Sequence, residues 1–459
     1  MKIFKDLFIK HNNLNESSFY ILYSNNTCLS GVVEVLPGSD GGYVENSIIK
    51  EPTIEGRYTI RDNSIDLQLH DGEWVSWKKI NDYLYQENDR EVIRLTDYNL
   101  TESFLITHQN QIQKKIEAVQ HGYSVLDTGL ETENIFVANW FLGNTCSYSC
   151  SYCPSYLNDG SIPWTDLEIL KNFIDTLFEK KAGQKIVIEF TGGEVTLFKD
   201  YGALCSYIKS KGGVISMITN GSRTMDWWRK NVQHFDVIAF SYHTEFADRT
   251  KYLELADFLK DKVDLNCNIM TPPGKLDFCL ELGEDIRKLG IYTVNLMPLI
   301  EDLEGELLPG YTQNELDVID QFNSTTSKEP VTNKTKVINK RSDLSKVYPD
   351  GKKQKISPPL LVSSKENTWW GWNCLSGVTQ IAIDAKGDIF RGWCMVGGKI
   401  GNIGNPNLTL PDNPVLCNKE LCHCHFDFYS KKRNYINKKL TNRYFDYVFN
   451  YKFLFSSLL

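Results

Sequence analysis

Long apolar runs are absent from this chain of 459 residues. No stretch of about eighteen consecutive apolar residues occurs, so the sequence predicts no membrane-spanning helix and no membrane partner. The opening residues, MKIFKDLFIKHNN, contain too short an apolar stretch for a signal peptide, which predicts a cytoplasmic protein. A net charge of -8 provides no global basic surface of the kind that binds nucleic acid.

Internal repeats and low-complexity tracts are also lacking, whereas cysteine is plentiful. Twelve cysteines in a chain expected to stay in a reducing compartment predict metal ligands rather than disulfides. The length allows two or three domains. A hydrophobic content of 41%, with 12% aromatic residues, is sufficient for large cores.

Three cysteines, Cys146, Cys150 and Cys153, fall within eight residues of the segment FLGNTCSYSCSYCPSYL. A four-iron, four-sulfur cluster takes one thiolate for each iron, so three thiolates leave one iron open to a small molecule. Zinc is the alternative metal, but it prefers four closed ligands, and only Cys150 and Cys153 have the usual pair spacing. Structural cysteines without a metal are a further alternative. The spacing therefore favours a cluster that performs chemistry.

The spacing Cys-x3-Cys-x2-Cys, with Tyr152 as the aromatic residue before the third cysteine, resembles the signature of the radical S-adenosylmethionine (radical SAM) superfamily. The resemblance implies that the amino and carboxylate groups of SAM chelate the open iron of the [4Fe-4S] cluster. An electron then splits SAM into methionine and a 5′-deoxyadenosyl radical, which removes a hydrogen atom from the substrate. A reductant protein such as flavodoxin or ferredoxin is the implied electron donor.

A pair of glycines follows the strand-like run KIVIEF, about forty residues after the cysteines. Gly192, Gly193 and Glu194 resemble the GGE motif of the same family. Two glycines let the backbone approach a ligand without a Cβ in the way. A carbonyl and a carboxylate can then accept hydrogen bonds from the SAM ammonium group. We expect these residues at the cofactor site, with a glycine turn and a solvated glutamate as the alternative.

Polar residues end the next two strand-like runs, GVISMITNGS and DVIAFSYHTEF. Asn220 ends the first run, and the second carries Ser241, His243 and Glu245; such positions suit the C-terminal rim of parallel strands. The resemblance implies hydrogen bonds from Asn220 and Ser241 to the SAM carboxylate and ribose. His243 and Glu245 are ribose contacts, a proton acceptor or ordinary rim residues, and a structural role suits His243 equally well.

Strand-like and helix-like stretches alternate with short loops from 134 to 300, which predicts a parallel sheet with right-handed connections. Six such units, rather than the eight of a full TIM barrel, indicate an α/β fold, the partial (β/α)6 TIM-like barrel of radical SAM proteins. In that family, adenine packs near the fifth and sixth strands, where Asn268, Leu296 and Met297 are the matching candidates. The helix-like stretches are 164–180, 199–212, 224–232, 247–260 and 276–289.

The flanking segments have different patterns. Short runs alternate apolar and polar residues before residue 130, which predicts a β-rich domain followed by a helix near 109–120. A later polar stretch carries nine Lys/Arg and three Asp/Glu between Lys328 and Lys355. We therefore expect a β-rich N-terminal domain at 1–130, the radical SAM core at 134–322, a basic linker or flap at 323–358, a C-terminal cluster-binding domain at 359–430 and a helical tail at 431–459.

Five further cysteines gather near the C-terminus: Cys374, Cys394, Cys417, Cys422 and Cys424. A short strand, a turn at DAKGD and a second strand lie between the first two. This arrangement resembles the auxiliary-cluster domain of SPASM and twitch proteins, in the shorter twitch form. The resemblance assigns Cys374, Cys394 and Cys424 to an auxiliary [4Fe-4S] cluster, with Cys417 and Cys422 competing for the fourth place. A zinc ribbon-like site is the alternative.

The leading hypothesis is a radical SAM enzyme, an oxidoreductase or a radical-mediated maturation enzyme, with one auxiliary cluster. Its substrate class stays open among peptides, sugars and nucleotides. A zinc-stabilised binding or scaffold protein is the rival from another class, and purified zinc protein is colourless. An electron-transfer protein is a third alternative, against which the glycine motif and the open coordination site argue.

Overall fold

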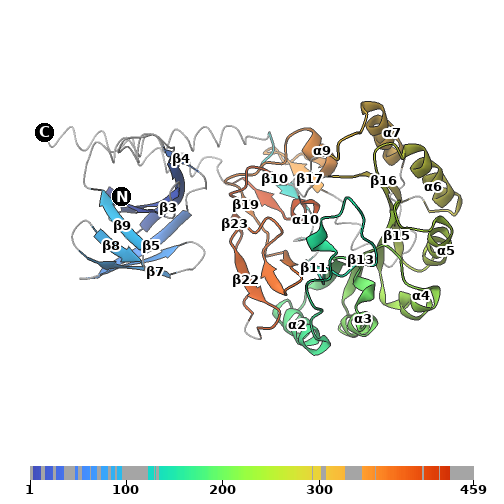
Figure 1. Cartoon of the computed structure of the whole chain (residues 1–459). Helices are drawn as coiled ribbons and strands as arrows, with labels where there is room; N and C mark the ends of the chain where they lie inside the picture. The colour runs from blue at the N-terminus through green and yellow to red at the C-terminus, as the bar shows by residue number, and fades with distance from the viewer. Residues whose placement is uncertain are drawn as a thin grey trace.

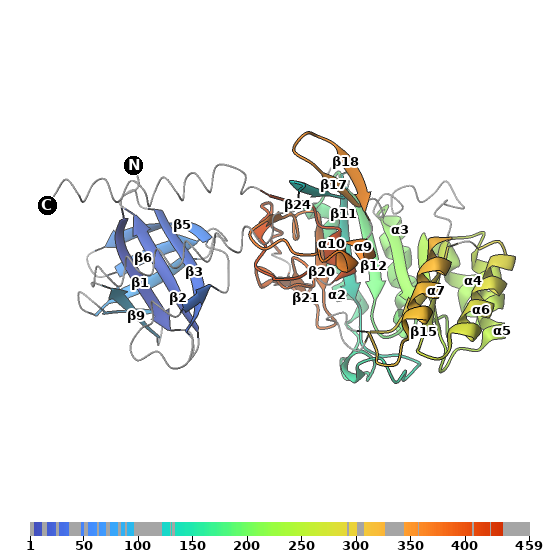
Figure 2. The same cartoon turned by 90° about the horizontal axis from the view of Figure 1, so that it is seen from above.

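The strands of the computed structural model form three sheets, which Figure 1 and Figure 2 show from two directions. None of the helices in the part of the chain that is described is long and apolar enough to cross a membrane. The described residues are 4–11, 16–23, 27–35, 47–49, 54–61, 64–69, 74–80, 84–87, 90–95, 122–128, 130, 134–291, 293–300, 307–325, 344–356, 358–405, 408–422 and 424–434.

The N-terminal strands form an antiparallel sheet that closes on itself, because β1 pairs with both β2 and β9, and β2 pairs with β3. The expected helix near 109–120 lies outside the described residues. The strands are β1 (Phe4–His11), β2 (Glu16–Tyr23), β3 (Thr27–Val35), β4 (Ser47–Ile49), β5 (Ile54–Arg61), β6 (Ser64–Leu69), β7 (Trp74–Lys79), β8 (Leu84–Glu87) and β9 (Arg90–Leu95).

Alternation along each strand explains the core of this closed sheet. In β6, Ile65 and Leu67 are buried, whereas Asp66 between them accepts a hydrogen bond of 2.6 Å from Ser76 on β7. Successive residues of a strand point to opposite faces, so the apolar side chains gather on one side. There the ring of Trp77 meets that of Tyr20 edge-on at 4.7 Å.

A second nine-stranded sheet is built on six parallel strands in chain order, β11 to β16, as the alternation of strands and helices predicts. The α/β fold is thereby confirmed. The strands are β11 (Ile135–Phe141), β12 (Lys185–Thr191), β13 (Val214–Thr219), β14 (Val237–His243), β15 (Asp264–Thr271) and β16 (Val294–Pro298). The helices between them are α2 (Leu167–Lys180), α3 (Tyr201–Ser210), α4 (Met225–Asn231), α5 (Arg249–Leu259) and α6 (Leu276–Lys288).

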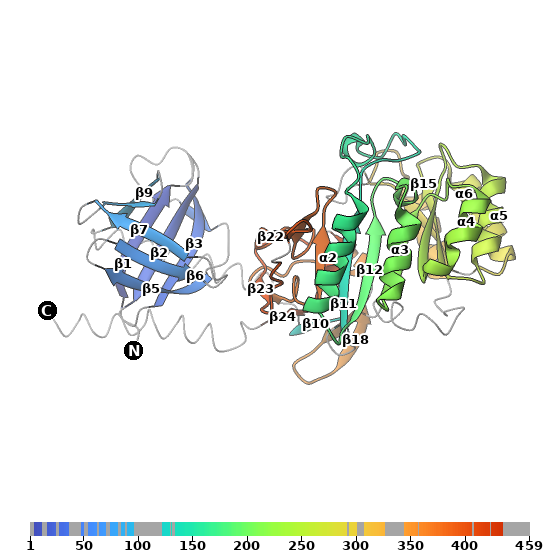
Figure 3. The ribbon, with the colours of Figure 1, turned by 90° about the horizontal axis from the view of Figure 1, so that it is seen from below.

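These helices cover one face of the sheet, as Figure 3 shows for α2, α3, α4 and α6. The helix α2 begins at a cap, where the Asp166 side chain accepts a hydrogen bond from the Glu168 backbone. Its buried residues follow the helical period, and Phe173 meets the buried ring of Trp140 on β11 edge-on at 5.1 Å. Alternate strand residues therefore face the helices, and the others face the opposite side of the sheet.

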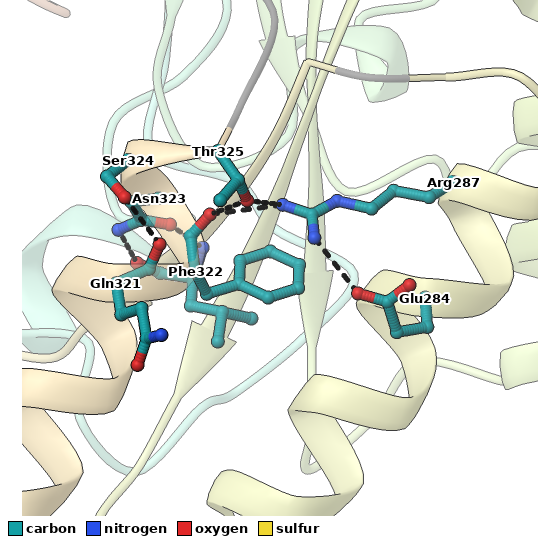
Figure 4. Close-up of polar contacts among 8 residues, drawn as sticks. Glu284, Arg287, Gln321, Phe322, Asn323, Ser324 and Thr325 are labelled. Carbon is teal, nitrogen blue, oxygen red and sulfur yellow. Dashed lines mark hydrogen bonds and ion pairs between the residues drawn. The ribbon is translucent and has the colours of Figure 1, made fainter.

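The helix α7 (Gln313–Ser324) completes this row and packs beside the edge strand β16. The Asn323 side chain accepts a hydrogen bond from the Leu296 backbone N–H and donates one to its carbonyl, so it pairs with the strand edge. Figure 4 shows Arg287 of α6 reaching over the Phe322 ring to the end of α7. Gly283 leaves room for that ring, because an added Cβ would lie 2.6 Å from it.

The C-terminal part extends the same sheet beyond β11. Strand β20 (Gln380–Ile383) pairs in parallel with β11, and β21 (Asp388–Phe390) and β22 (Lys399–Asn402) follow as antiparallel strands. The predicted hairpin at DAKGD is therefore confirmed as the β20–β21 connection. The C-terminal segment that carries Cys394 thus adds strands to the sheet whose strand β11 leads into the loop of Cys146, Cys150 and Cys153.

The third sheet joins segments that lie far apart in the sequence. Its strands are β10 (Val125–Asp127), β17 (Leu344–Val347), β18 (Lys353–Ile356), β19 (Asn373–Cys374), β23 (Val415–Leu416) and β24 (Lys432–Arg433). Part of the stretch expected as a linker or flap therefore forms the antiparallel pair β17–β18. The expected helical tail begins instead with the strand β24, and residues after 434 lie outside the described part.

Candidate functional site

The first cysteine loop directly follows β11, at the carboxyl end of the parallel strands. Cys146, Cys150 and Cys153 are all free thiols, and the backbone N–H of Cys153 donates to the carbonyl of Cys150 at 3.0 Å. The pKa of Cys150 is raised to about 11, mainly by burial and also by negative charge on Glu245, Cys146 and Cys153. The three thiols therefore act on one another, and a cationic metal at this place would favour their thiolate forms.

Side chains from the ends of two neighbouring strands hold this loop. Asn220, just after β13, donates to the Ser147 hydroxyl at 3.1 Å and approaches the Cys146 sulfur at 3.7 Å. Glu245, just after β14, accepts from the backbone N–H of Ser151 at 2.8 Å and from its hydroxyl at 2.5 Å. Glu245 therefore fixes the loop, and the three roles predicted for it from the sequence stay open.

His243, the last residue of β14, lies beneath the aromatic residue of the cysteine motif. Its Nδ1 atom is 2.8 Å from the Tyr152 hydroxyl and 3.5 Å from the Cys150 sulfur. The two rings stack with an interplanar angle of 5°. Burial lowers the pKa of His243 to about 4, so the ring is neutral at physiological pH and can accept the Tyr152 hydrogen bond. Its observed contacts support the structural alternative.

The glycine motif packs against the backbone that leads into the cysteine loop. Gly193 donates its N–H to the carbonyl of Gly143 at 2.9 Å, and Glu194 donates to that of Thr145 at 2.8 Å. An added Cβ on Gly192 or Gly193 would collide with the carbonyl oxygen of Gly143 or Thr145, respectively. The glycines are therefore required by contact between two backbone segments, and their approach to a ligand stays a prediction.

Glu194 is fully buried, and its predicted contact with the SAM ammonium group stays a prediction. One carboxylate oxygen accepts hydrogen bonds from the Thr196 backbone, the Thr196 hydroxyl and the Thr219 hydroxyl, and the other accepts from the Asn220 backbone. Burial raises the pKa of Glu194, which these four hydrogen bonds oppose. The carboxylate thus ties the end of β12 to the end of β13.

Asn144 organises the other side of the loop and was not among the residues predicted from the sequence. It is fully buried. Its amide donates to Asp159 at 2.6 Å and to the Tyr156 carbonyl at 3.1 Å, and its oxygen accepts from the Ile162 backbone at 3.0 Å. An asparagine two residues before a cysteine carries no local signal, because the partners follow more than ten residues later.

Ser241, Asn268 and Met297 lie on the sheet face opposite the helices. Ser241 pairs in register with Asn268, and Met270 pairs with both His243 and Met297, so the candidates form two adjacent rows across three strands. The Asn268 oxygen accepts a hydrogen bond of 3.3 Å from Asn295. Leu296 points the other way, into the helix-packed core, which corrects its expected contact with adenine.

The second cysteine group is assembled by backbone pairing. Cys374 lies on β19, and the backbone N–H of Cys417 donates to the Trp372 carbonyl at 2.8 Å. The Cys422 N–H donates to Asn367 at 2.7 Å, and the Asn367 amide returns a hydrogen bond of 3.0 Å. Cys394 donates its N–H to the Asp427 carboxylate at 2.7 Å. Four different segments therefore bring these residues together.

The electrostatic contacts of two thiols link them to others of this group. Burial raises the pKa of Cys394, and charge on Asp427, Cys374 and Cys417 adds to this effect. Burial also raises the pKa of Cys422, to which Cys417 and Cys394 contribute. Cys424 packs against an apolar group that includes Phe426. The structure therefore places Cys422 among these thiols, and the assignment of Cys424 as a ligand stays a prediction.

Three of the four remaining cysteines, Cys205, Cys267 and Cys279, are fully buried in the apolar core, where a free cysteine packs as a small hydrophobic residue. Within the described residues, no group of three or more His, Cys, Asp or Glu side chains is arranged to hold a single metal ion. A four-iron cluster instead binds each thiolate at a separate iron, and thiolates are the donors that such clusters take.

Comparison with known proteins gives a family match and a curated relative. Residues 140–301 match the family model described as Radical SAM superfamily. A curated relative, the S-adenosylmethionine-dependent nucleotide dehydratase of Selenomonas ruminantium, is 34% identical over 89 residues, 19% of this chain and 30% of the relative. The alignment thus spans less than a third of that relative's length.

Solved structures give weaker likenesses. Streptococcus suis SuiB bound to its precursor peptide SuiA has 13% sequence identity and a TM-score of 0.41, covering 76% of this chain and 87% of SuiB. A structure of anSMEcpe with bound AdoMet has 14% identity and a TM-score of 0.39, covering 59% of this chain and 78% of that protein. Scores below 0.5 support no conclusion about activity. From the family match, this chain carries a radical SAM domain and is an enzyme.

Proposed function

We propose that this enzyme binds a [4Fe-4S] cluster through Cys146, Cys150 and Cys153 and cleaves SAM reductively to a 5′-deoxyadenosyl radical. The radical then abstracts hydrogen from a substrate that is a peptide, a sugar or a nucleotide. The observation that carries the proposal is a loop with three free thiols and, among the described cysteines, no fourth thiol on the same loop. The unshared iron would be the place where SAM binds.

The residues around the loop have separate roles in this proposal. Asn220 and Glu245 fix the loop, and His243 holds the Tyr152 ring. SAM would lie against the backbone of Gly192 and Gly193, with Ser241, Asn268 and Met297 on the strand rows beside it. The parallel strands would curve into a partial (β/α)6 barrel, so that this face surrounds the cofactor and substrate.

At β11 and β12, the sheet face that carries Ser241 and Asn268 is polar, which suits a substrate that makes many hydrogen bonds. Asn139 on β11 donates to the Glu189 carboxylate on β12 at 3.1 Å and accepts from the Trp393 ring N–H at 2.8 Å. Trp393 belongs to the C-terminal segment, next to Cys394. A substrate held here would therefore lie between the two cysteine groups.

We also propose an auxiliary [4Fe-4S] cluster in a SPASM/twitch-like domain at 359–430, with Cys374, Cys394, Cys417 and Cys422 as ligands. Two observations support this ligation: the four cysteines converge from four segments, and charge on one thiol raises the pKa of another. Thiolates are also the donors that such clusters take. A flavodoxin or ferredoxin would supply electrons, and the closed N-terminal sheet would serve substrate docking. We expect the enzyme to act in the cytoplasm.

The test is anaerobic reconstitution of the full chain with iron and sulfide, followed by addition of dithionite and SAM. We expect about seven to eight irons per chain and formation of 5′-deoxyadenosine. The variant with Cys146→Ala, Cys150→Ala and Cys153→Ala should form none, whereas Cys205→Ala, a buried core change, should retain activity. A colourless protein that binds zinc and forms no 5′-deoxyadenosine would support the zinc-stabilised scaffold instead.

A further inference from the structure

Lys432 is a buried lysine next to the second cysteine group. It lies on β24, where it pairs directly with Cys374 of the antiparallel strand β19. Directly opposed residues of antiparallel strands project their side chains from the same face, so the lysine and the cysteine side chains are neighbours. Only 2% of Lys432 is exposed, although lysine is almost never fully buried without a partner.

The ammonium group is held by backbone carbonyls and an aromatic ring. Its Nζ atom donates to the carbonyls of Asp427 at 2.7 Å and Ser430 at 2.9 Å, and lies 3.5 Å from that of Phe428. It also lies 4.6 Å from the centroid of the Trp369 ring. Within the described residues, no carboxylate oxygen comes within salt-bridge distance of this nitrogen.

The nearest carboxylate is used elsewhere. Asp427 accepts hydrogen bonds from the backbone N–H groups of Trp393 at 3.1 Å and Cys394 at 2.7 Å. A buried charge is expected to be paired or to neutralise another charge. Neutral thiols do not supply that charge. With free thiols, the ammonium group of Lys432 therefore contacts only backbone carbonyls and the Trp369 ring among the described residues.

Ligated thiolates would supply the missing negative charge. Four thiolates on a [4Fe-4S] core of charge +2 give a net charge of -2, and uptake of one electron makes it -3. Lys432 lies directly opposite Cys374, with its side chain on the same face of the paired strands, so negative charge on that thiolate would act on the ammonium group at close range.

We propose that Lys432 is the counter-charge of the auxiliary cluster and that it raises the reduction potential of that cluster. The inference rests on the proposed four-cysteine ligation. A fixed positive charge stabilises the more negative, reduced form, because the low dielectric of the interior strengthens the attraction. The lysine thereby makes this cluster a better one-electron acceptor than the same ligands would give alone.

The test is a potentiometric titration, followed by electron paramagnetic resonance, of the reconstituted full chain. Cys146→Ala, Cys150→Ala and Cys153→Ala are included throughout, so that only the auxiliary cluster gives a signal. Lys432→Met should shift the equilibrium at least tenfold towards the oxidised cluster, which is 59 mV for one electron. Lys432→Arg keeps the charge and should shift it less than threefold.

Two further variants control for structural damage. Lys431→Met removes the adjacent lysine, which faces Asp127 at 3.4 Å, and should leave the potential unchanged. Asp427→Asn removes a negative charge beside the thiols and should shift the equilibrium towards the reduced cluster. If Lys432→Met fails to bind iron, Lys432→Gln serves as a second neutral variant, and an unchanged potential in it overturns the counter-charge role.

The experiments distinguish an error in the role of Lys432 from an error in the proposed four-cysteine ligation. A chain that binds about four irons in total, all lost with the three N-terminal cysteine changes, would show that no auxiliary cluster exists. A chain with a normal auxiliary cluster and equal potentials in Lys432→Met and the parent would overturn the role of Lys432 alone.

Discussion

Single side chains from neighbouring strand ends set the position of the cysteine loop. Glu194 joins two strand ends from within the core, Asn220 and Glu245 bind the loop itself, and Asn144 orders the residues that follow it. Except for Glu245, these groups are buried. At the scale of one residue, the site is therefore a set of polar side chains that fix backbone and leave the thiols available.

Gly193→Ala should destabilise the chain, because an added Cβ meets the Thr145 carbonyl and neither backbone segment can move without breaking the other's hydrogen bonds. We expect a loss of about 1–3 kcal/mol in the free energy of unfolding, measured by chemical denaturation of the apo chain. Gly122→Ala is the matched control, since its Cβ would make only ordinary contact with Tyr348. Equal stability of the two variants would refute the close-packing explanation.

Glu245→Ala should loosen the cysteine loop without unfolding the protein, because an exposed carboxylate there makes two hydrogen bonds to Ser151. We expect the reconstituted chain to lose iron to a chelator about fivefold faster, the effect of one net hydrogen bond. Glu179→Ala, an exposed change in α2, should release iron at the parental rate. Parental release from both variants would mean that Glu245 does not hold the loop.

At the scale of elements, α7 protects the open edge of the parallel sheet. Asn323 fills the hydrogen-bonding positions of β16, and Arg287 joins α6 to the last turn of α7 (Figure 4). The guanidinium donates to the Phe322 carbonyl at 3.1 Å and to the Thr325 hydroxyl at 3.0 Å while lying 3.6 Å from the Phe322 ring centroid. The edge strand is therefore covered by a helix, which prevents pairing with other chains.

Arg287→Ala should remove these contacts and lower the free energy of unfolding by about 1–3 kcal/mol. Lys288→Ala is the matched control: its ion pair with Asp285 lies on the surface, so little stability depends on it. Thermal or chemical denaturation measures both. Similar losses in the two variants would contradict the account of how α7 is anchored.

The elements of the parallel sheet were predictable because their residues alternate or repeat with a clear period. The run 185–190 became β12, and the stretch 276–289 became α6 with nearly the same ends. The strand β18 was missed because Lys353, Gln354 and Lys355 are all exposed, so no alternation marks it. A strand that buries only its last residue has the composition of a loop.

At the scale of the whole molecule, the sequence identified the chemistry but not the grouping of distant residues. The motif gave Cys146, Cys150 and Cys153 directly, since their spacing is local. The buried lysine beside Cys374 depends on which strands pair, and strands β19 and β24 are only two residues long. Such short strands leave no periodic pattern from which their partners could be inferred.

The C-terminal part joins the sheet of the first cysteine loop, because β20 pairs directly with β11, the strand before that loop. Trp393, next to Cys394, reaches Asn139 on the same strand. Loss of the hydrogen bond from the Trp393 ring to Asn139 should therefore disturb the sheet face between the two cysteine groups. For Trp393→Phe, we expect SAM cleavage without substrate to continue while coupling of cleavage to substrate turnover falls, measured as 5′-deoxyadenosine formed per product.

The central claim is that one iron of the first cluster has no protein ligand and binds SAM. Its most direct test is magnetic resonance of the reduced cluster with SAM labelled with nitrogen-15 in its amino group, in a full chain carrying Ala at Cys374, Cys394, Cys417 and Cys422. The account predicts a hyperfine coupling from the labelled nitrogen to the cluster. A reduced cluster whose spectrum is unchanged by SAM, with a fourth side chain bound to iron, would contradict it.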